Sequence, residues 1–415
     1  MTPSVNWMLA FLLLLVEPSA NTSGFGRAVV RLGDLDGDGR AEFAILEHPQ
    51  SAVLAVFEQR PAVDDVWIVS TKSFEVFRKH SIPCVSDRDS ELPRVVATGD
   101  FDGDGVGDVA ARGRTSECAI VRVWSGRTGA LIVEHRLPGV GSRGAFVALD
   151  DLDGDCVPEL ALGDRGFGEP LLPAGAGRVC IVSGATGNVL HELAGEWRHA
   201  ALGDEATLVS DGDGHADLFV TLGESGDPQR YDALLLSTAT GRIVRTFADL
   251  CGRRSERTCT SGGDGRVWVG GSDSVVELRV DGDERCWTLP GVYGEQFGSS
   301  LVRLRDEHSP GRTRIAVGSP ARGVGEGLVQ IFTAEDRRET ARVELAPYDD
   351  VWNVGHGLAA LDDIDGDGVE DLAVATRNDL AGEPGVVFVA SGATGTIFWR
   401  HVRAHDRVDR LLGAR

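Results

Sequence analysis

The chain has 415 residues, of which 54 are glycine, and its formal charge is −23 at pH 7. A charge of this size and sign argues against a nucleic-acid partner, because phosphates require a basic face. Frequent glycine, few aromatic residues and no long segment of 3.6-residue periodicity favour an all-β fold with many short strands and tight turns.

The N-terminus has the pattern of an export signal. An apolar run covers Trp7 to Val16, and Pro18, Ser19 and Ala20 follow it as a site for cleavage near Ala20. We therefore predict that residues 1–20 are a signal peptide and that the protein is secreted, extracellular or periplasmic. A buried first strand is the alternative. No stretch reaches the roughly 18 apolar residues that a transmembrane helix needs, so we expect no span in the mature chain.

The cysteines fit an oxidising compartment. There are seven: Cys84, Cys118, Cys156, Cys180, Cys251, Cys259 and Cys286. Disulfides are expected among them, and Cys251 with Cys259, or Cys84 with Cys118, are the pairs that lie within reach of one another in sequence. The odd number leaves at least one thiol over, and buried thiols without bridges are the alternative.

Acidic loops that lead into short apolar strands recur along the chain. The loop Asp34–Glu42 precedes the apolar run Phe43–Leu46, and the best preserved copy, Asp363–Asp371, precedes Leu372–Ala375. Counting degenerate copies, the loops start near residues 34, 100, 151, 209, 260, 306 and 363. A fixed period of this length, about 50 residues, is typical of propellers and solenoids.

The loops carry the ligands that a hard cation prefers. In Asp363–Asp371, carboxylates occupy positions one, three, five and nine, and position six is a glycine that can adopt a positive φ. Ca²⁺ takes about six to eight oxygen ligands, and alternating aspartates supply several at once. An EF-hand would need a glutamate at position twelve on a helix, whereas Val374 stands there within a predicted strand.

A second landmark recurs in each unit. Ser-Gly-x-Thr-Gly or a close variant separates two β-rich runs at Ser125–Gly129, Ser183–Gly187, Ser237–Gly241 and Ser391–Gly395, which is hairpin chemistry. Each unit therefore reads as strand, acidic loop, strand, connection, strand, turn and strand. Seven such units predict a seven-bladed β-propeller of four-stranded antiparallel blades over residues 21–403, followed by an arginine-rich tail at 404–415.

The repeats resemble FG-GAP repeats, the blades of the integrin alpha-subunit N-terminal propeller and of many secreted bacterial proteins. Phe25-Gly26 and Phe297-Gly298 match the FG half, Gly318-Ser319-Pro320 matches the GAP half, and the acidic loops match the calcium loops of that family. The resemblance covers nearly all of residues 24–402. It implies Ca²⁺ at about four sites, together with a weaker fifth site.

The resemblance also implies the ligands: side chains at positions one, three, five and nine, and the carbonyl of position seven. The four complete loops would supply Asp34, Asp36, Asp38, Arg40 and Glu42; Asp100, Asp102, Asp104, Val106 and Asp108; Asp151, Asp153, Asp155, Val157 and Glu159; and Asp363, Asp365, Asp367, Val369 and Asp371. A fifth, degenerate loop would use Asp211, Asp213 and Asp217. The third loop departs from the family pattern, with Cys156 in place of the turn glycine.

The function expected from the resemblance is that of a non-catalytic, calcium-stabilised adhesion module. It would be a monomer that binds an extracellular protein or polysaccharide through the face opposite the calcium loops. The ions themselves are expected to be structural, because a stapling role accounts for every acidic residue of the loops. A propeller-type polysaccharide lyase or hydrolase is the alternative, since an acid–base pair drawn from different blades leaves no local motif.

Overall fold

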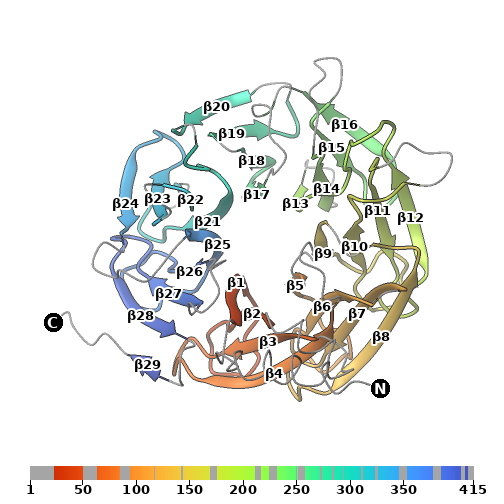
Figure 1. Ribbon diagram of the computed structural model, residues 1–415, viewed down its shortest axis with the longest axis horizontal. Helices are drawn as coiled ribbons and strands as arrows, with labels where there is room; N and C mark the ends of the chain where they lie inside the picture. Colours follow the sequence, from red (N-terminus) through yellow and green to blue (C-terminus); the bar gives the residue numbers. More distant parts are fainter. Residues whose placement is uncertain are drawn as a thin grey trace, which may run out of the picture.

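The protein is described here by a computed structural model. It describes residues 23–49, 63–84, 94–115, 117–141, 144–168, 175–210, 216–223, 231–248, 250, 258–271, 273–282, 285–292, 294–309, 312–322, 326–344, 353–376, 385–402 and 407–409. These residues form seven antiparallel sheets arranged in a closed ring (Figure 1). The predicted seven-bladed propeller is confirmed. In the described part of the chain, no helix is long and apolar enough to cross a membrane.

Each blade is a meander in which consecutive strands pair. Blades 1 to 3 consist of β1 (Ser23–Arg31), β2 (Phe43–Pro49), β3 (Val63–Val69) and β4 (Val76–Pro83); β5 (Arg94–Ala97), β6 (Val109–Arg114), β7 (Cys118–Trp124) and β8 (Leu131–Pro138); and β9 (Phe146–Ala148), β10 (Leu160–Gly163), β11 (Arg178–Val182) and β12 (Val189–Ala194). Blades 4 and 5 consist of β13 (Ala206–Ser210), β14 (Ala216–Thr221), β15 (Ala233–Leu236) and β16 (Ile243–Phe247); and β17 (Thr258–Gly263), β18 (Arg266–Gly270), β19 (Ser274–Arg279) and β20 (Arg285–Pro290). Blades 6 and 7 consist of β21 (Ser300–Arg305), β22 (Thr313–Ser319), β23 (Leu328–Thr333) and β24 (Glu339–Val343); and β25 (Val354–Ala360), β26 (Leu372–Thr376), β27 (Val386–Ala390) and β28 (Ile397–Val402).

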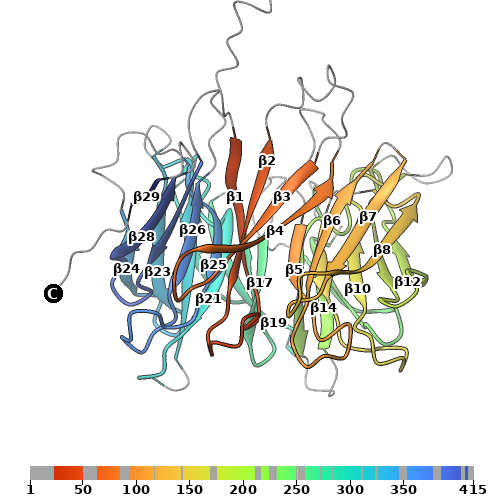
Figure 2. The ribbon, with the colours of Figure 1, turned by 90° about the horizontal axis from the view of Figure 1, so that it is seen from below.

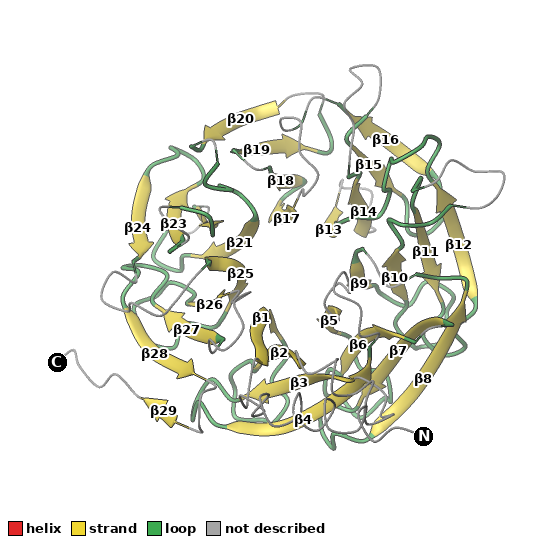
Figure 3. Ribbon diagram, viewed as in Figure 1, coloured by secondary structure: helices red, strands yellow, loops and turns green. Residues whose placement is uncertain are grey.

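The position of a strand in its blade decides its burial. The first strand of each blade lies nearest the central axis and the fourth lies at the rim (Figures 1 and 3). The two middle strands pack against neighbouring blades on both faces, so β26 and β27 are buried along their whole length and read as continuous apolar runs. The rim strand β12 alternates between exposed and half-buried residues. Seen edge-on in Figure 2, the strands of the blades are tilted with respect to the axis of the ring.

The ring closes by side-chain packing and by polar contacts, in which Arg31 of β1 forms ion pairs with Asp362 and Glu370 of blade 7. Blade 1 and blade 7 each take all four strands from one continuous segment, so neither exchanges a strand with the other. A single buried cluster joins them, in which Phe25 and Phe43 of blade 1 meet Ala373, Val387 and Trp399 of blade 7. The same kind of cluster, for example around Leu162 of blade 3 and Val121 of blade 2, joins other neighbouring blades.

The last blade also gains a fifth strand from the C-terminal segment. Within the segment predicted to be a tail, β29 (Arg407–Asp409) pairs antiparallel with β28 at the rim. The other residues of 404–415 lie outside the described residues, as do residues 1–20 of the predicted signal peptide.

Hydrogen bonds join the outer strand of one blade to the turn of the next. In four successive pairs of blades, an arginine or histidine side chain of the rim strand bonds a backbone carbonyl of the following blade. The pairs are Arg78 with Gly126, His135 with Gly184, His191 with Ala239, and Arg245 with Gly282. His191, which belongs to no sequence motif, thus links blades 3 and 4.

None of the six described cysteines forms a disulfide. The predicted bridge between Cys84 and Cys118 is wrong, because each thiol faces a different neighbour. The Cys84 thiol is half-buried and bonds the carboxylate of Asp64, and both the desolvation and this carboxylate raise its pKa. The Cys118 sulfur lies 3.6 Å from the Thr115 hydroxyl. Cys259 is also free, so its predicted bridge to Cys251, which lies outside the described residues, is not formed either.

Candidate metal centres

Each complete acidic loop bends through two residues of positive φ, at positions four and six. In the first loop these are Gly37 (φ 79°) and Gly39 (φ 88°). Cys156 adopts φ 69° at position six of the third loop, where its Cβ is strained. The third loop therefore keeps the bend of the others despite its substitution.

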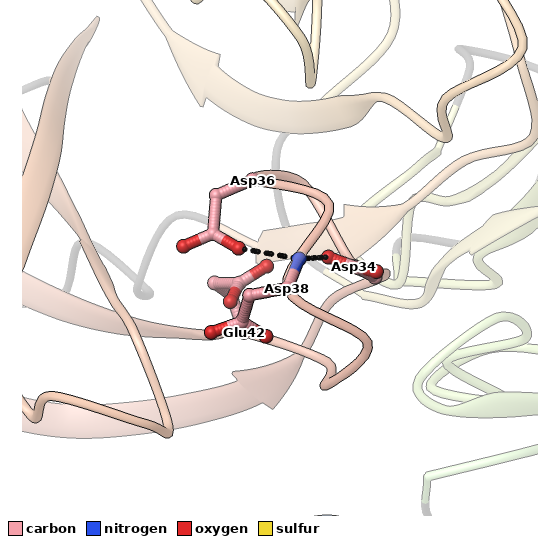
Figure 4. Close-up of side chains that lie close together, drawn as sticks. All are labelled: Asp34, Asp36, Asp38 and Glu42. Atoms are coloured by element: carbon pink, nitrogen blue, oxygen red, sulfur yellow. Dashed lines mark hydrogen bonds between the residues drawn. The ribbon is translucent and has the colours of Figure 1, made fainter.

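The first aspartate organises the loop before any ion is considered. Asp34 accepts hydrogen bonds at Oδ1 from the backbone of Gly37 (2.7 Å) and Asp38 (3.1 Å), and at Oδ2 from Gly39 (2.9 Å). Asp363 makes the equivalent three bonds at 2.7, 3.0 and 2.8 Å. These bonds wrap the backbone around the first carboxylate and turn the following side chains toward it, as Figure 4 shows for the first loop.

In the first and third loops, all four carboxylates converge. One oxygen from each of four side chains lies within 4.8 Å of the others. The sets are Asp34, Asp36, Asp38 and Glu42, drawn in Figure 4, and Asp151, Asp153, Asp155 and Glu159. The predicted side-chain ligands of these two loops are thus brought together.

The glutamate at position nine gives the strongest structural argument for a bound cation. Glu42 is fully buried, and its Oε2 accepts a hydrogen bond from the Leu35 backbone at 2.6 Å. Its Oε1 is buried with no hydrogen-bond donor among the described residues, and the same holds for Oε1 of the buried Glu159. Burial, reinforced by the neighbouring aspartates, raises the pKa of each carboxyl to about 7. An unpaired buried carboxylate oxygen is costly unless a cation binds it.

In the second and seventh loops, three carboxylates converge in place of four. The sets are Asp100, Asp102 and Asp108, and Asp363, Asp365 and Asp371. Position nine is here the shorter aspartate, and backbone amides bind both of its oxygens. Asp108 accepts bonds from Phe101 (2.6 Å) and Gly126 (2.7 Å). Burial raises the pKa of Asp108, and that of Asp371 to about 7.

The aspartate at position five is bound elsewhere in these two loops. Asp104 forms an ion pair with Arg127 at 3.1 Å, and Asp367 accepts a hydrogen bond from the Ser391 hydroxyl at 2.9 Å. Both partners belong to the Ser-Gly-x-Thr-Gly turn of the same blade. Sequence reasoning did not connect the turn to the metal loop, although their constant spacing within the repeat was the available signal.

The turn packs directly on the loop. A Cβ at Gly126 would lie 1.9 Å from the carbonyl oxygen of Gly107, and one at Gly392 would lie 2.0 Å from that of Glu370. Only glycine therefore fits at this position of the turn in blades 2 and 7. The turn that we interpreted as a hairpin connection also forms one wall of the acidic loop.

The degenerate fourth loop is not tested by the structure. Asp211 and Asp213 lie outside the described residues, and Asp217 is a buried residue of β14. The carbonyls of Arg40, Val106, Val157 and Val369 remain ligands implied by the family pattern.

The donor set fits a hard cation. The four described clusters consist of carboxylates alone, which suit Ca²⁺ and Mg²⁺ better than the softer metals that prefer thiolate or imidazole. The two unpaired glutamate oxygens point to the same conclusion. The four clusters could therefore hold Ca²⁺.

Comparison with known proteins agrees with the architecture. A stretch of 95 residues, 21% of the chain, is 36% identical to integrin alpha-PS5 of Drosophila melanogaster. The chain resembles an integrin alpha propeller of the FG-GAP type. It spans about 9% of the length of that relative, and no protein-family model matches it. The resemblance expected from the repeats is thereby confirmed, together with the seven-bladed ring.

Proposed function

We propose that the chain is a secreted, calcium-stabilised propeller that binds an extracellular protein or polysaccharide without catalysis. The observation that carries the calcium part is the pair of buried, unpaired oxygens on Glu42 and Glu159, each beside three aspartates. The observation that carries the binding part is the local similarity to an integrin alpha chain on a ring of the same type.

The ions act as staples in this proposal. Without metal, three or four like charges are crowded together in each loop, which opposes folding at neutral pH. Extracellular modules bind Ca²⁺ with Kd values of about 10⁻⁴–10⁻³ M. At millimolar Ca²⁺ and a Kd of about 10⁻⁴ M, each site adds about 1.4 kcal/mol to the free energy of unfolding. Four sites add about 5–6 kcal/mol, comparable to the net stability of many domains.

A ligand would meet the opposite end of the blades, because the metal loops and their turns fill one end. Paired charges occupy this opposite end in blades 2 to 4. Arg94, at the start of β5, pairs with Glu205 of blade 4 across the short strand β9. Arg165 pairs with Asp204 at 2.8 Å, and burial raises the pKa of Asp204 to about 6. Such groups can bind a polar ligand by exchanging internal ion pairs for intermolecular ones.

The binding role is tested by screening the calcium-loaded protein against a glycan array and an array of extracellular protein domains. The expected result is that at least one array member binds. Metal-loop variants that remain folded should still bind it, and variants that unfold should not. Any glycan that binds is then incubated with the protein and examined for shorter products. Depolymerised product would overturn the non-catalytic assignment in favour of a lyase or hydrolase.

A further inference from the structure

The third residue of the turn between the last two strands differs among the four blades that have a complete acidic loop. In blade 1 this turn is Ser70–Phe74. The third residue is Lys72 in blade 1, Arg127 in blade 2, Ala185 in blade 3 and Ala393 in blade 7. In blades 1 and 2 its cationic group reaches the position-five aspartate of the same blade. The Lys72 Nζ lies 3.6 Å from Asp38 Oδ2, and the Arg127 Nε lies 3.1 Å from Asp104 Oδ2.

Arg127 is the better placed of the two cations. Besides the ion pair, its Nη2 donates a hydrogen bond to the backbone carbonyl of Asp104 at 2.8 Å. The backbone carbonyl of Arg127 accepts a hydrogen bond from Arg78 of blade 1, which fixes the turn beneath the side chain. Lys72 makes a single longer contact from a side chain that is 64% exposed, and Asp38 still joins the four-carboxylate cluster. Asp104, in contrast, lies outside the cluster of its loop.

We propose that Arg127 is an internal counter-cation that competes with Ca²⁺ for Asp104, so that the second loop is the last of the four to fill as Ca²⁺ rises. The inference rests on the proposed calcium binding. For all four carboxylates of the second loop to bind Ca²⁺, Asp104 must first break its ion pair with Arg127. The bound Ca²⁺ then lies near the positive charge of the unpaired Arg127 guanidinium. Both effects weaken binding relative to a loop without a cation.

The other loops provide the comparison. In the third loop, Ala185 leaves Asp155 free of any cation on the turn, and four carboxylates already converge. In the seventh loop, Asp367 is held by the neutral hydroxyl of Ser391, which can stay bonded to a carboxylate that also binds an ion. Among the four complete loops, only the second combines three converged carboxylates with an arginine that pairs with its position-five aspartate.

The same contact has a consequence at low Ca²⁺. The guanidinium offsets part of the negative charge that the four carboxylates of the second loop bring together. The second blade thus depends less on the ion than the third blade does. The chain would therefore hold calcium sites of two different affinities, and the blade-2 site would fill at the highest Ca²⁺ concentration.

The test is a calorimetric titration of the full chain with Ca²⁺ alone, comparing wild type with Arg127→Ala. The substitution should tighten the weakest site by about three- to tenfold, from loss of an exposed ion pair and of charge repulsion. Arg136→Ala is the matched control, because Arg136 is an exposed arginine of the same blade that pairs with Glu134. Arg136→Ala should leave the Ca²⁺ affinity of every site within about threefold of its wild-type value. The reciprocal variant Ala185→Arg, at an exposed position, should weaken one site.

A background variant assigns the effect to its loop. In Asp102→Asn, which disables the second loop, Arg127→Ala should alter none of the remaining sites. If wild type binds Ca²⁺ but Arg127→Ala leaves all affinities unchanged, or acts no differently from Arg136→Ala, the inference is overturned while the proposed function stands. If wild type binds no Ca²⁺, the proposed function itself fails, and the inference with it.

Discussion

Phe74 of the first blade stacks on Trp399 of the last, with ring centroids 5.1 Å apart and ring planes inclined by 20°. Phe74 lies in the turn between β3 and β4, and Trp399 lies on the rim strand β28 and is 1% exposed. Trp399 also packs edge-on against Phe43, at 6.0 Å. The joint between the two blades therefore combines this aromatic packing with the ion pairs of Arg31, and it is made without an exchanged strand or a disulfide among the described residues.

Truncating this joint should destabilise the ring. Trp399→Ala removes a fully buried indole and is expected to lower the free energy of unfolding by about 3–5 kcal/mol. A double-mutant cycle with Phe74→Ala, measured by chemical denaturation, should give a coupling energy of about 0.5–1.5 kcal/mol for the stacked pair.

The control for the joint is Trp399→Phe. The indole Nε1 has no hydrogen-bond acceptor among the described residues, so phenylalanine keeps the stacking and loses no polar contact. The expected loss is below about 1.5 kcal/mol. Equal losses for the alanine and phenylalanine variants would show that the stacking does not hold the ring closed.

Calcium removal should lower thermal stability. Four sites that together contribute about 5–6 kcal/mol correspond to a fall in Tm of about 5–8 °C for a chain of this size in excess EGTA. Re-addition of Ca²⁺ should restore the melting temperature, and Mg²⁺ at the same concentration should restore less of it. An unchanged Tm in EGTA would contradict the stapling role.

Each loop should bind its own ion. Asp365 belongs to the three-carboxylate cluster of the seventh loop, so Asp365→Ala should reduce the bound Ca²⁺ by one equivalent. Equilibrium dialysis with metal analysis gives this number directly. Asp281→Ala is a suitable control, because Asp281 pairs with Arg279 outside the acidic loops. It should leave the number of bound ions unchanged.

Much of the ring was predictable because its determinants are local. The acidic loop, the apolar run and the glycine turn each act over fewer than about ten residues, and each recurs in phase. The apolar run Leu372–Ala375 lies within β26 (Leu372–Thr376), and the turn Ser391–Gly395 separates β27 (Val386–Ala390) from β28 (Ile397–Val402), as its pattern predicted. The first aspartate of a loop organises neighbours only three to five residues away, as in Asp34.

The features that could not be predicted from the sequence depend on segments that come into contact only after folding. Phe74 and Trp399 lie at opposite ends of the chain, and no pattern marks them as a pair. Arg127 and Asp104 belong to the same repeat, but their contact requires the turn to fold back over the loop. Whether a position-nine carboxylate keeps an unpaired oxygen depends on one methylene, which separates Glu42 from Asp108.

Neutralising a position-nine glutamate should have opposite effects with and without calcium. Glu42→Gln removes a buried carboxylate that lacks a partner on Oε1, so at pH 8 in EGTA it should raise the free energy of unfolding by about 1 kcal/mol. In millimolar Ca²⁺ the same variant also loses the stabilisation of about 1.4 kcal/mol that one bound ion supplies, so its free energy of unfolding should fall below that of wild type by about 0.4 kcal/mol.

The matched control for this reversal is Glu75→Gln, which neutralises an exposed glutamate of the same blade. It should shift stability little in either buffer. Denaturation curves of both variants in EGTA and in Ca²⁺ suffice. If Glu42→Gln changes the free energy of unfolding by the same amount in both buffers, Glu42 is not a ligand.

Stability should also fall in acid through His80. The His80 ring stacks on Trp124 of the next blade, with centroids 4.6 Å apart. Burial, with the nearby charge of Arg78, lowers the pKa of His80 to about 4. An unfolded histidine titrates near 6.5, so the unfolded state binds the proton more tightly between these values. The stabilisation that the neutral His80 ring gives the folded state is therefore complete above pH 6.5. It is lost as the pH falls toward 4, and the free energy of unfolding then decreases by up to about 1.4 kcal/mol per pH unit.

The pH effect is isolated by comparing wild type with His80→Phe, which keeps an aromatic ring against Trp124 but cannot be protonated. Both proteins are unfolded by denaturant from pH 7.5 to 4.5 in excess Ca²⁺, so that the acidic loops are loaded at the upper end of the range. The difference in unfolding free energy between the two should shift in favour of the variant as the pH falls through 6.5. Parallel pH profiles would show that His80 binds its proton equally in both states.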